Sequence, residues 1–133
     1  MDVLDLFAGT GSVGFEFLSR GAKWVEFVEK NNIHYNFIRK VLRELEISNA
    51  RIIKSDCFLY MKSVKRKFDI VFADPPYDLK TFDTIPEKIM ESELLKENGM
   101  FILEHSGNYA FEQLEGFQEK RKYGGVNFSF FYK

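Results

Sequence analysis

An acid, two prolines and an aromatic ring follow directly on an apolar run in the segment FADPPYD at 72–78. Proline has a fixed φ and no backbone N–H, so Pro75 and Pro76 should form a rigid elbow with few competing donors. Asp74 and the backbone carbonyl of Pro75 could then accept both hydrogens of an amine held against them. Tyr77 could stack on the ring that carries this amine, a contact worth about 1–3 kcal/mol for a nucleobase.

The exocyclic amine of a nucleobase is a weak nucleophile because its lone pair is delocalised into the ring. Two acceptors that hold both N–H hydrogens draw the nitrogen toward tetrahedral geometry and direct its lone pair at an incoming methyl group. The alternative is a surface loop in which Asp74 only caps the end of a strand. We interpret the elbow as a methyl-transfer site with the catalytic residues Asp74, Pro75, Pro76 and Tyr77.

A glycine-rich turn, GTGSVG at 9–14, separates an apolar segment from a helix-like one and fits the pattern G-x-G-x-x-G. Gly9 and Gly11 would let the backbone approach a ligand closely. Glu29 follows Gly9 at the spacing of about 20 residues that is expected for an acid binding a ribose. Taken alone, this motif fits a dinucleotide site or a tight turn without a ligand.

Acids near the glycine turn distinguish between two nucleotide cofactors. Asp5 precedes the first glycine by four residues, and Asp56 and Asp74 end later apolar segments. A pyrophosphate favours a helix N-terminus free of nearby acids, whereas the ammonium and sulfonium groups of S-adenosylmethionine suit them. A chain of 133 residues is also too short for a second nucleotide-binding half and a substrate domain. Both observations favour S-adenosylmethionine.

Strand-like and helix-like segments alternate along the chain. The expected strands are 2–8, 23–29, 50–56, 68–74 and 99–106, the last opened by the sequence ENG. The expected helices are 13–20, 31–46, 57–64, 85–94 and 109–115, and a hairpin with strands 117–123 and 126–133 follows. This alternation predicts an α/β fold with a mostly parallel sheet covered on both faces. In such sheets ligands bind at the carboxyl ends of the strands, where the acids lie.

The composition is that of an ordinary globular chain, with 45% hydrophobic and 29% charged residues, and predicts one domain over residues 1–133. The net charge of −1 gives no support to wholesale binding of a phosphate backbone. The single cysteine, Cys57, cannot form an internal disulfide, which favours a cytoplasmic protein. No apolar run reaches membrane-spanning length, and no spacing is typical of metal ligands.

The segment VLDLFAGTGSVGFEFLSRGA at 3–22, together with Glu29 and DPPY at 74–77, resembles class I S-adenosylmethionine-dependent methyltransferases that act on amino groups. The tail YGGVNFSFFYK narrows the resemblance to the bacterial 16S ribosomal RNA guanine-N2 methyltransferase family. This resemblance implies a Rossmann-like methyltransferase fold with a seven-stranded sheet that ends in an antiparallel hairpin. It also implies an enzyme that methylates guanine N2 in ribosomal RNA or the small ribosomal subunit. We further expect a monomeric, cytoplasmic protein that binds neither a membrane nor a metal.

The same resemblance implies roles for individual residues. Asp5 and the first two glycines of the turn would line the methionine end of the cofactor, Glu29 would hold the ribose, and Asp56 would accept from the adenine amine. The elbow would face the target base. The full set of cofactor-binding residues implied in this way is Asp5, Gly9, Gly11, Glu29, Lys30, Asp56, Cys57 and Phe58.

Other functions remain open at this point. DNA adenine-N6 and cytosine-N4 methyltransferases share the elbow, whereas glutamine-modifying relatives usually carry Asn in place of Asp74. A fragment that binds nucleotide or RNA without turnover and a small dinucleotide-dependent oxidoreductase are further alternatives.

The family that the chain resembles also carries a basic segment before the glycine-rich strand, and this sequence begins on that strand. We therefore expect the chain to fold but to methylate RNA weakly by itself. Its remaining phosphate contacts would come from the basic clusters at 62–67 and 120–122.

Overall fold

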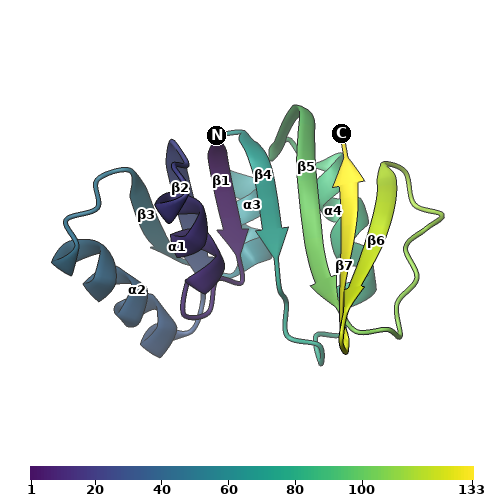
Figure 1. Ribbon diagram of the computed structural model, residues 1–133, viewed down its shortest axis with the longest axis horizontal. Helices are drawn as coiled ribbons and strands as arrows, with labels where there is room; N and C mark the ends of the chain where they lie inside the picture. Colours follow the sequence, from purple (N-terminus) through teal and green to yellow (C-terminus); the bar gives the residue numbers. More distant parts are fainter.

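The computed structural model describes residues 1–133, in which strands and helices alternate as far as the fifth strand and a hairpin follows (Figure 1). The strands are β1 (Asp2–Leu6), β2 (Trp24–Glu29), β3 (Ala50–Lys54), β4 (Phe68–Ala73), β5 (Leu95–His105), β6 (Phe117–Tyr123) and β7 (Val126–Tyr132). The helices are α1 (Ser12–Ser19), α2 (Asn32–Glu44), α3 (Cys57–Ser63) and α4 (Ile85–Glu91), with the short 3₁₀ helix η1 (Phe82–Thr84) before α4.

All strands belong to one 7-stranded sheet in the order β3-β2-β1-β4-β5-β7-β6. The first five strands pair in parallel, and β7 pairs antiparallel with both β5 and β6. This arrangement confirms the expected mostly parallel sheet with an antiparallel hairpin at its end. The strand order reverses between β1 and β4, which is the place where open α/β sheets bind their ligands.

Helices cover both faces of the sheet: α1 and α2 lie on the face turned toward the viewer in Figure 1, and α3 and α4 lie behind it. Because side chains alternate along a strand, neighbouring residues of each strand enter different cores. Val3 and Phe27 belong to the core under α1 and α2. Leu4 belongs to the larger core on the other face, with Tyr60 of α3 and Ile85 of α4. No helix combines the length and the apolar character needed to cross a membrane.

The segment 109–115 forms turns, so the prediction of a helix there was wrong. The rings of Tyr109 and Phe111 stack with centroids 5.8 Å apart, and both meet His105 edge-on. In a helix, residues two apart point to opposite sides, so these two rings could not pack in this way. Aromatic packing therefore determines the conformation of this segment.

The sequence ENG at 97–99 lies inside β5 and does not open it, because the strand already begins at Leu95. The pairing with β4 shifts its register between Phe68 and Ile70. Asn98 has a φ of 68°, and such left-handed residues are typical of bulges. The strand therefore starts four residues earlier than the expected residue 99 and accommodates one local irregularity.

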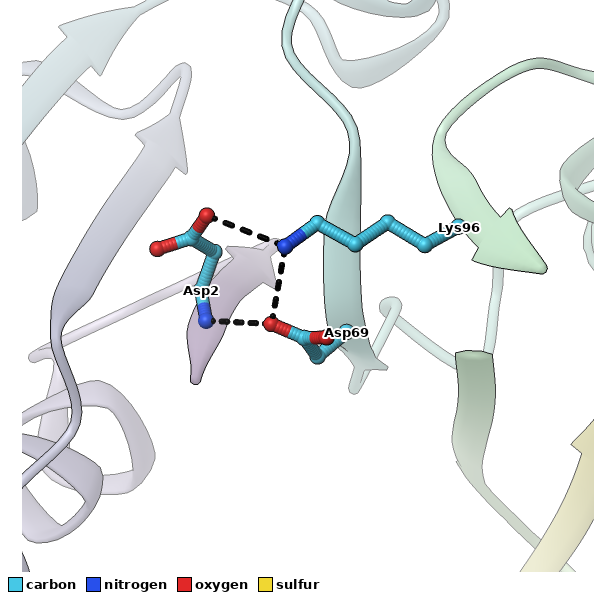
Figure 2. Close-up of polar contacts among 3 residues, drawn as sticks. All are labelled: Asp2, Asp69 and Lys96. Carbon is cyan, nitrogen blue, oxygen red and sulfur yellow. Dashed lines mark hydrogen bonds and ion pairs between the residues drawn. The ribbon is translucent and has the colours of Figure 1, made fainter. Parts of the chain in front are cut away.

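Three charged residues join the amino ends of β1, β4 and β5, at the edge of the sheet opposite the strand ends that carry the acids. Figure 2 shows the ammonium of Lys96 between Asp2 and Asp69, at N–O distances of 3.3 Å and 3.1 Å. The backbone N–H of Asp2 donates to Asp69 at 2.7 Å, and this bond is the main cause that lowers the pKa of the Asp69 carboxyl. The cluster holds the register of strands that are far apart in sequence.

Candidate active site

A cavity of about 770 Å³ opens at the carboxyl ends of the parallel strands, beside the reversal of strand order. Small-molecule sites typically measure about 300–1,000 Å³. All four acids that the sequence pattern places at strand ends line this cavity, namely Asp5, Glu29, Asp56 and Asp74. The fold therefore gathers these carboxyl groups at one edge, as the parallel arrangement requires.

Asp5 is the most deeply placed of these acids, with 2% of its surface exposed. Burial raises the pKa of its carboxyl to about 8, opposed by the N–H of Gly14, which donates to it at 3.0 Å. The negative charges of Asp74 and Glu29 raise this pKa further. A carboxyl group in such a place is stabilised as an anion by a bound cation. The cavity thus suits a ligand that carries positive charge.

The glycine turn forms one wall of the cavity, but its three glycines have different tasks. Gly9 lines the cavity with a φ of 58° and no atom near the position of a Cβ. Gly11 was expected to line it as well, but it is buried behind the wall with a φ of 83°, against Phe15 and Ile38. We therefore assign Gly11 to the shape of the turn and Gly9 to the approach of a ligand.

Glu29 connects the end of β2 to the glycine turn. One carboxylate oxygen accepts the N–H of Gly9 and the other accepts the N–H of Asn31, both at 2.7 Å. Each oxygen keeps a second lone pair, and the half-buried side chain lines the cavity. Glu29 can therefore accept ligand hydroxyls while its position is held by the backbone.

Asp56 begins α3 as its N-cap, because its Oδ1 accepts the N–H groups of Phe58 and Leu59 at 2.9 Å and 3.1 Å. Its second oxygen is free of these bonds. Cys57 is buried beside it, and burial raises the pKa of its thiol to about 12, so it lines the cavity without being a nucleophile. Phe58 adds an aromatic ring that meets Phe7 edge-on at 6.4 Å.

Lys30 lines the cavity as an exposed residue, as the resemblance implies. Asn31 and His34, at the start of α2, also line the cavity but were not expected there. The sequence did contain a signal for His34, which lies in the first turn of the helix that follows Glu29. The first turn of that helix must lie at the carboxyl ends of the parallel strands, where ligands bind. The remaining lining residues that were not expected are Phe7, Ala8, Thr10, Ser12, Val13, Phe72 and Leu79.

The elbow at 74–77 separates this cavity from a second one of about 190 Å³, and Asp74, Pro75 and Tyr77 line both. The Pro76 carbonyl accepts the N–H of Leu79 at 3.0 Å, whereas the Pro75 carbonyl accepts no backbone hydrogen bond. Asp74 is exposed and Tyr77 keeps 84% of its surface exposed. The carboxyl group, the unpaired carbonyl and the aromatic ring that the interpretation of the elbow requires therefore belong to residues shared by the two cavities.

Comparisons with known proteins agree with this architecture. The model of the family described as conserved hypothetical protein 95 matches residues 1–132. Among solved structures, a conserved hypothetical protein from Streptococcus pyogenes superposes with a TM-score of 0.88 at 26% identity, covering 99% of this chain and 85% of that one.

Two curated proteins share the name ribosomal RNA small subunit methyltransferase D. The protein of Haemophilus influenzae is 36% identical over 107 residues, which cover 77% of this chain and 55% of the relative. The protein of Buchnera aphidicola subsp. Acyrthosiphon pisum is 30% identical over 102 residues, which cover 76% of this chain and 53% of the relative. The chain thus spans about half the length of the curated relatives that it matches.

Proposed function

This chain belongs to the family described as conserved hypothetical protein 95, and from this premise we propose that it is an S-adenosylmethionine-dependent RNA methyltransferase. The methyl group is transferred to an exocyclic amine of a nucleobase, which we propose to be guanine N2 of 16S ribosomal RNA. The name of the two curated relatives supports RNA of the small ribosomal subunit as the substrate. The elbow that lines two cavities at once is the observation that carries the proposal.

The larger cavity holds the cofactor in this proposal. Asp5 faces its cationic methionine end, Glu29 accepts from the ribose hydroxyls, and the free oxygen of Asp56 accepts from the adenine amine. When bound, S-adenosylmethionine supplies an electrophilic methyl group and leaves as S-adenosylhomocysteine. Acids on this wall suit a sulfonium and an ammonium, and they disfavour the pyrophosphate of a dinucleotide.

The smaller cavity holds the base. Asp74 and the Pro75 carbonyl accept the two N–H hydrogens of the amine, which directs the nitrogen lone pair toward the larger cavity. The new N–C bond forms as the methyl–sulfur bond breaks, and the nitrogen gives one proton to Asp74. Partial desolvation of the carboxyl raises the pKa of Asp74 although the side chain keeps contact with solvent, and this favours the uptake of that proton. Tyr77, whose ring is free, stacks on the base.

The decisive experiment measures methyl transfer from labelled S-adenosylmethionine into naked small-subunit ribosomal RNA, assembled small subunits and DNA. We expect label in RNA or subunits and none in DNA. Replacing Asp74 by Asn should lower the rate by about 10²–10³-fold, the effect of removing one positioned polar partner in other enzymes. The affinity for S-adenosylhomocysteine, measured by calorimetry, should stay within about threefold of that of the wild type.

Asp78→Asn is the matched control, because this exposed carboxylate lies in the same loop and lines neither cavity. It should keep the full rate. Near-normal transfer by Asp74→Asn would show that the reacting amine does not bind at the elbow. Binding of NAD more tightly than S-adenosylmethionine would exclude the proposed cofactor, and transfer to DNA alone would support the adenine-N6 or cytosine-N4 alternative.

A further inference from the structure

A carboxylate outside the expected site, Glu104, lines the smaller cavity together with Asp74 of the elbow. The cavity lies between the elbow and the turn of the β6–β7 hairpin, which contributes Gly125 and Val126. Its volume of about 190 Å³ is below the range of about 300–1,000 Å³ that is typical of whole small-molecule sites. The space is suited to a single planar ring system whose edge meets the cavity wall.

The register of the sheet brings Glu104 next to Asp74. In the parallel pair β4–β5, Phe72 is opposite Ile102 and Ala73 is opposite Leu103. Continuing this register by one residue puts Asp74 beside Glu104 on the same face, because side chains alternate along both strands. Both residues line the smaller cavity, and the charge of Asp74 raises the pKa of the Glu104 carboxyl. Two acceptors from adjacent strands therefore point into one small cavity.

The residue after Glu104 fixes the backbone at this point. The imidazole of His105 is hydrogen-bonded through Nε2 to the Ser129 hydroxyl and through Nδ1 to the Ser106 carbonyl, both at 2.7 Å. His105 is 5% exposed and lines the smaller cavity as well. Both ring nitrogens have partners, so His105 holds the strand end while Glu104 faces the cavity.

We propose that Glu104 recognises the N1–H of a guanine whose N2 amine is held by Asp74. This inference rests on the proposed function and adds a residue that determines which base is accepted. Guanine presents N1–H and N2–H₂ as adjacent donors on its Watson–Crick edge. Adenine and cytosine present an acceptor nitrogen beside their exocyclic amine, and a carboxylate opposite such an acceptor is repelled. The pair Asp74 and Glu104 thus matches guanine and opposes the other two amino bases.

The two carboxyl groups influence each other's charge. Burial raises the pKa of the Glu104 carboxyl, and the neighbouring charge of Asp74 raises it further. Two carboxylates this close repel each other in the absence of a bridging donor. A ligand edge with two adjacent N–H donors relieves this repulsion, whereas an acceptor on the ligand edge adds repulsion against the carboxylate that it faces.

The test changes the base and Glu104 together. The methylated nucleotide is first mapped in small-subunit RNA by mass spectrometry, and RNAs are then assembled with guanosine or 2-aminopurine riboside at that position. 2-Aminopurine keeps the amine at C2 but has an acceptor at N1. We expect the wild-type protein to prefer guanine by about 10- to 100-fold in kcat/KM, since a charged acceptor faces an acceptor in the analogue.

Glu104→Gln should reduce this preference to within about threefold, because a Gln amide can either accept from or donate to N1. Glu104→Asp, which keeps the charge, should retain a preference for guanine. Glu97→Gln is the matched control, since Glu97 is an exposed residue of the same strand at its other end and should leave the preference unchanged. Thermal unfolding of each variant shows whether it is folded.

A merely structural role of Glu104 would lower the rates on both RNAs equally and leave their ratio unchanged, and that result would overturn the inference alone. Failure of the wild-type protein to methylate any RNA would overturn the proposed function, and this inference with it. A wild-type preference for 2-aminopurine would likewise reject Glu104 as the group that recognises N1–H.

Discussion

At the scale of the residue, Asp5 is an acid whose surroundings differ strongly from water. It is almost fully buried, and burial together with Asp74 and Glu29 raises the pKa of its carboxyl from an ordinary 3.8 to about 8. At neutral pH the ligand-free protein therefore holds a proton on Asp5. A cation bound in the cavity would favour the release of this proton.

Asp5 should make the fold less stable as the pH rises. An acid whose pKa is higher in the folded than in the unfolded chain binds more protons when folded, so its contribution falls with pH between about 4 and 8. The slope for one such group reaches about 1.4 kcal/mol of unfolding free energy per pH unit. We expect Asp5→Asn to remove this slope, as measured by urea unfolding at several pH values.

Asp83→Asn serves as the control for this measurement, because Asp83 is exposed. It should leave the dependence of stability on pH as in the wild type. If the curves of Asp5→Asn and the wild type stay parallel from pH 5 to pH 8, then Asp5 is ionised in the folded protein and the assigned pKa is wrong.

At the scale of the element, α1 lies close to the sheet only because Gly14 has no side chain. A Cβ at this position would lie 2.2 Å from the ring of Phe27 on β2, which is fully buried. This is the role of the third glycine in the fingerprint, where helix and strand pack closely. The glycine turn therefore serves the contact between helix and sheet as well as the ligand.

Gly14→Ala should destabilise the protein by about 1–3 kcal/mol or more, because the buried ring has to move to accommodate the new methyl group. Thermal and urea unfolding measure the loss. Gly107→Ala is the control: the nearest atom to its Cβ would be 3.7 Å away, an ordinary contact, and the change should stay within about 0.5 kcal/mol. Equal effects of both substitutions would contradict the close packing of α1.

A second contact between elements joins β2 and α3 through a buried carboxylate. Glu26 is fully buried and accepts hydrogen bonds from the Tyr60 hydroxyl, from Arg51 Nε at 2.8 Å and from Trp24 Nε1 at 3.3 Å. A buried charge is tolerated only where donors satisfy it. The three donors come from β2, β3 and α3, so this network connects elements far apart in sequence.

Tyr60→Phe should cost about 1.5–3 kcal/mol of unfolding free energy, the typical value of a hydrogen bond to a charged group. The ring stays in place, so the loss reports the missing hydroxyl and not a cavity. Tyr132→Phe at an exposed position is the control and should be nearly neutral. A loss below about 0.5 kcal/mol for Tyr60→Phe would mean that water replaces the hydroxyl at Glu26.

At the scale of the whole molecule, one basic cluster lies near the amino ends of the parallel strands and the other lies near their carboxyl ends. Lys62, Lys65, Arg66 and Lys67 precede β4 at the amino edge, where Arg66 lies 4.5 Å from the ring centroid of Trp24. Lys120, Arg121 and Lys122 lie on β6, paired with the part of β7 that begins at the hairpin turn. This turn lines the smaller cavity, so the second cluster is beside the elbow.

Only the cluster on β6 should contribute to RNA binding near the site. Replacing Arg121 and Lys122 by Ala should weaken binding to small-subunit RNA and lower the salt slope of log K by about 0.7 for each phosphate that is no longer neutralised. Replacing Lys65 and Lys67 by Ala should change neither quantity. Filter binding over a range of salt concentrations tests this. A larger effect of replacing Lys65 and Lys67 would instead indicate that RNA binds near the amino ends of the parallel strands.

The sequence by itself determined the features that depend on local pattern. The alternation of apolar segments predicted the parallel sheet, and the strand order confirms it. The acids at the strand ends, Glu29 among them, line one cavity because the carboxyl ends of parallel strands lie at the same edge of the sheet. The ligand role of the GTGSVG turn and the rigidity of the two-proline elbow stay predictions.

Only the tertiary structure decided which distant residues became neighbours. The partners of Glu26, the ring packing at 109–115 and the adjacency of Asp74 and Glu104 depend on strand order and register, which the local pattern does not contain. Glu104 ends an apolar strand as the other acids do, so the same signal was present in the sequence. Its significance became visible only when β5 was found beside β4, because parallel pairing places equivalent strand ends side by side.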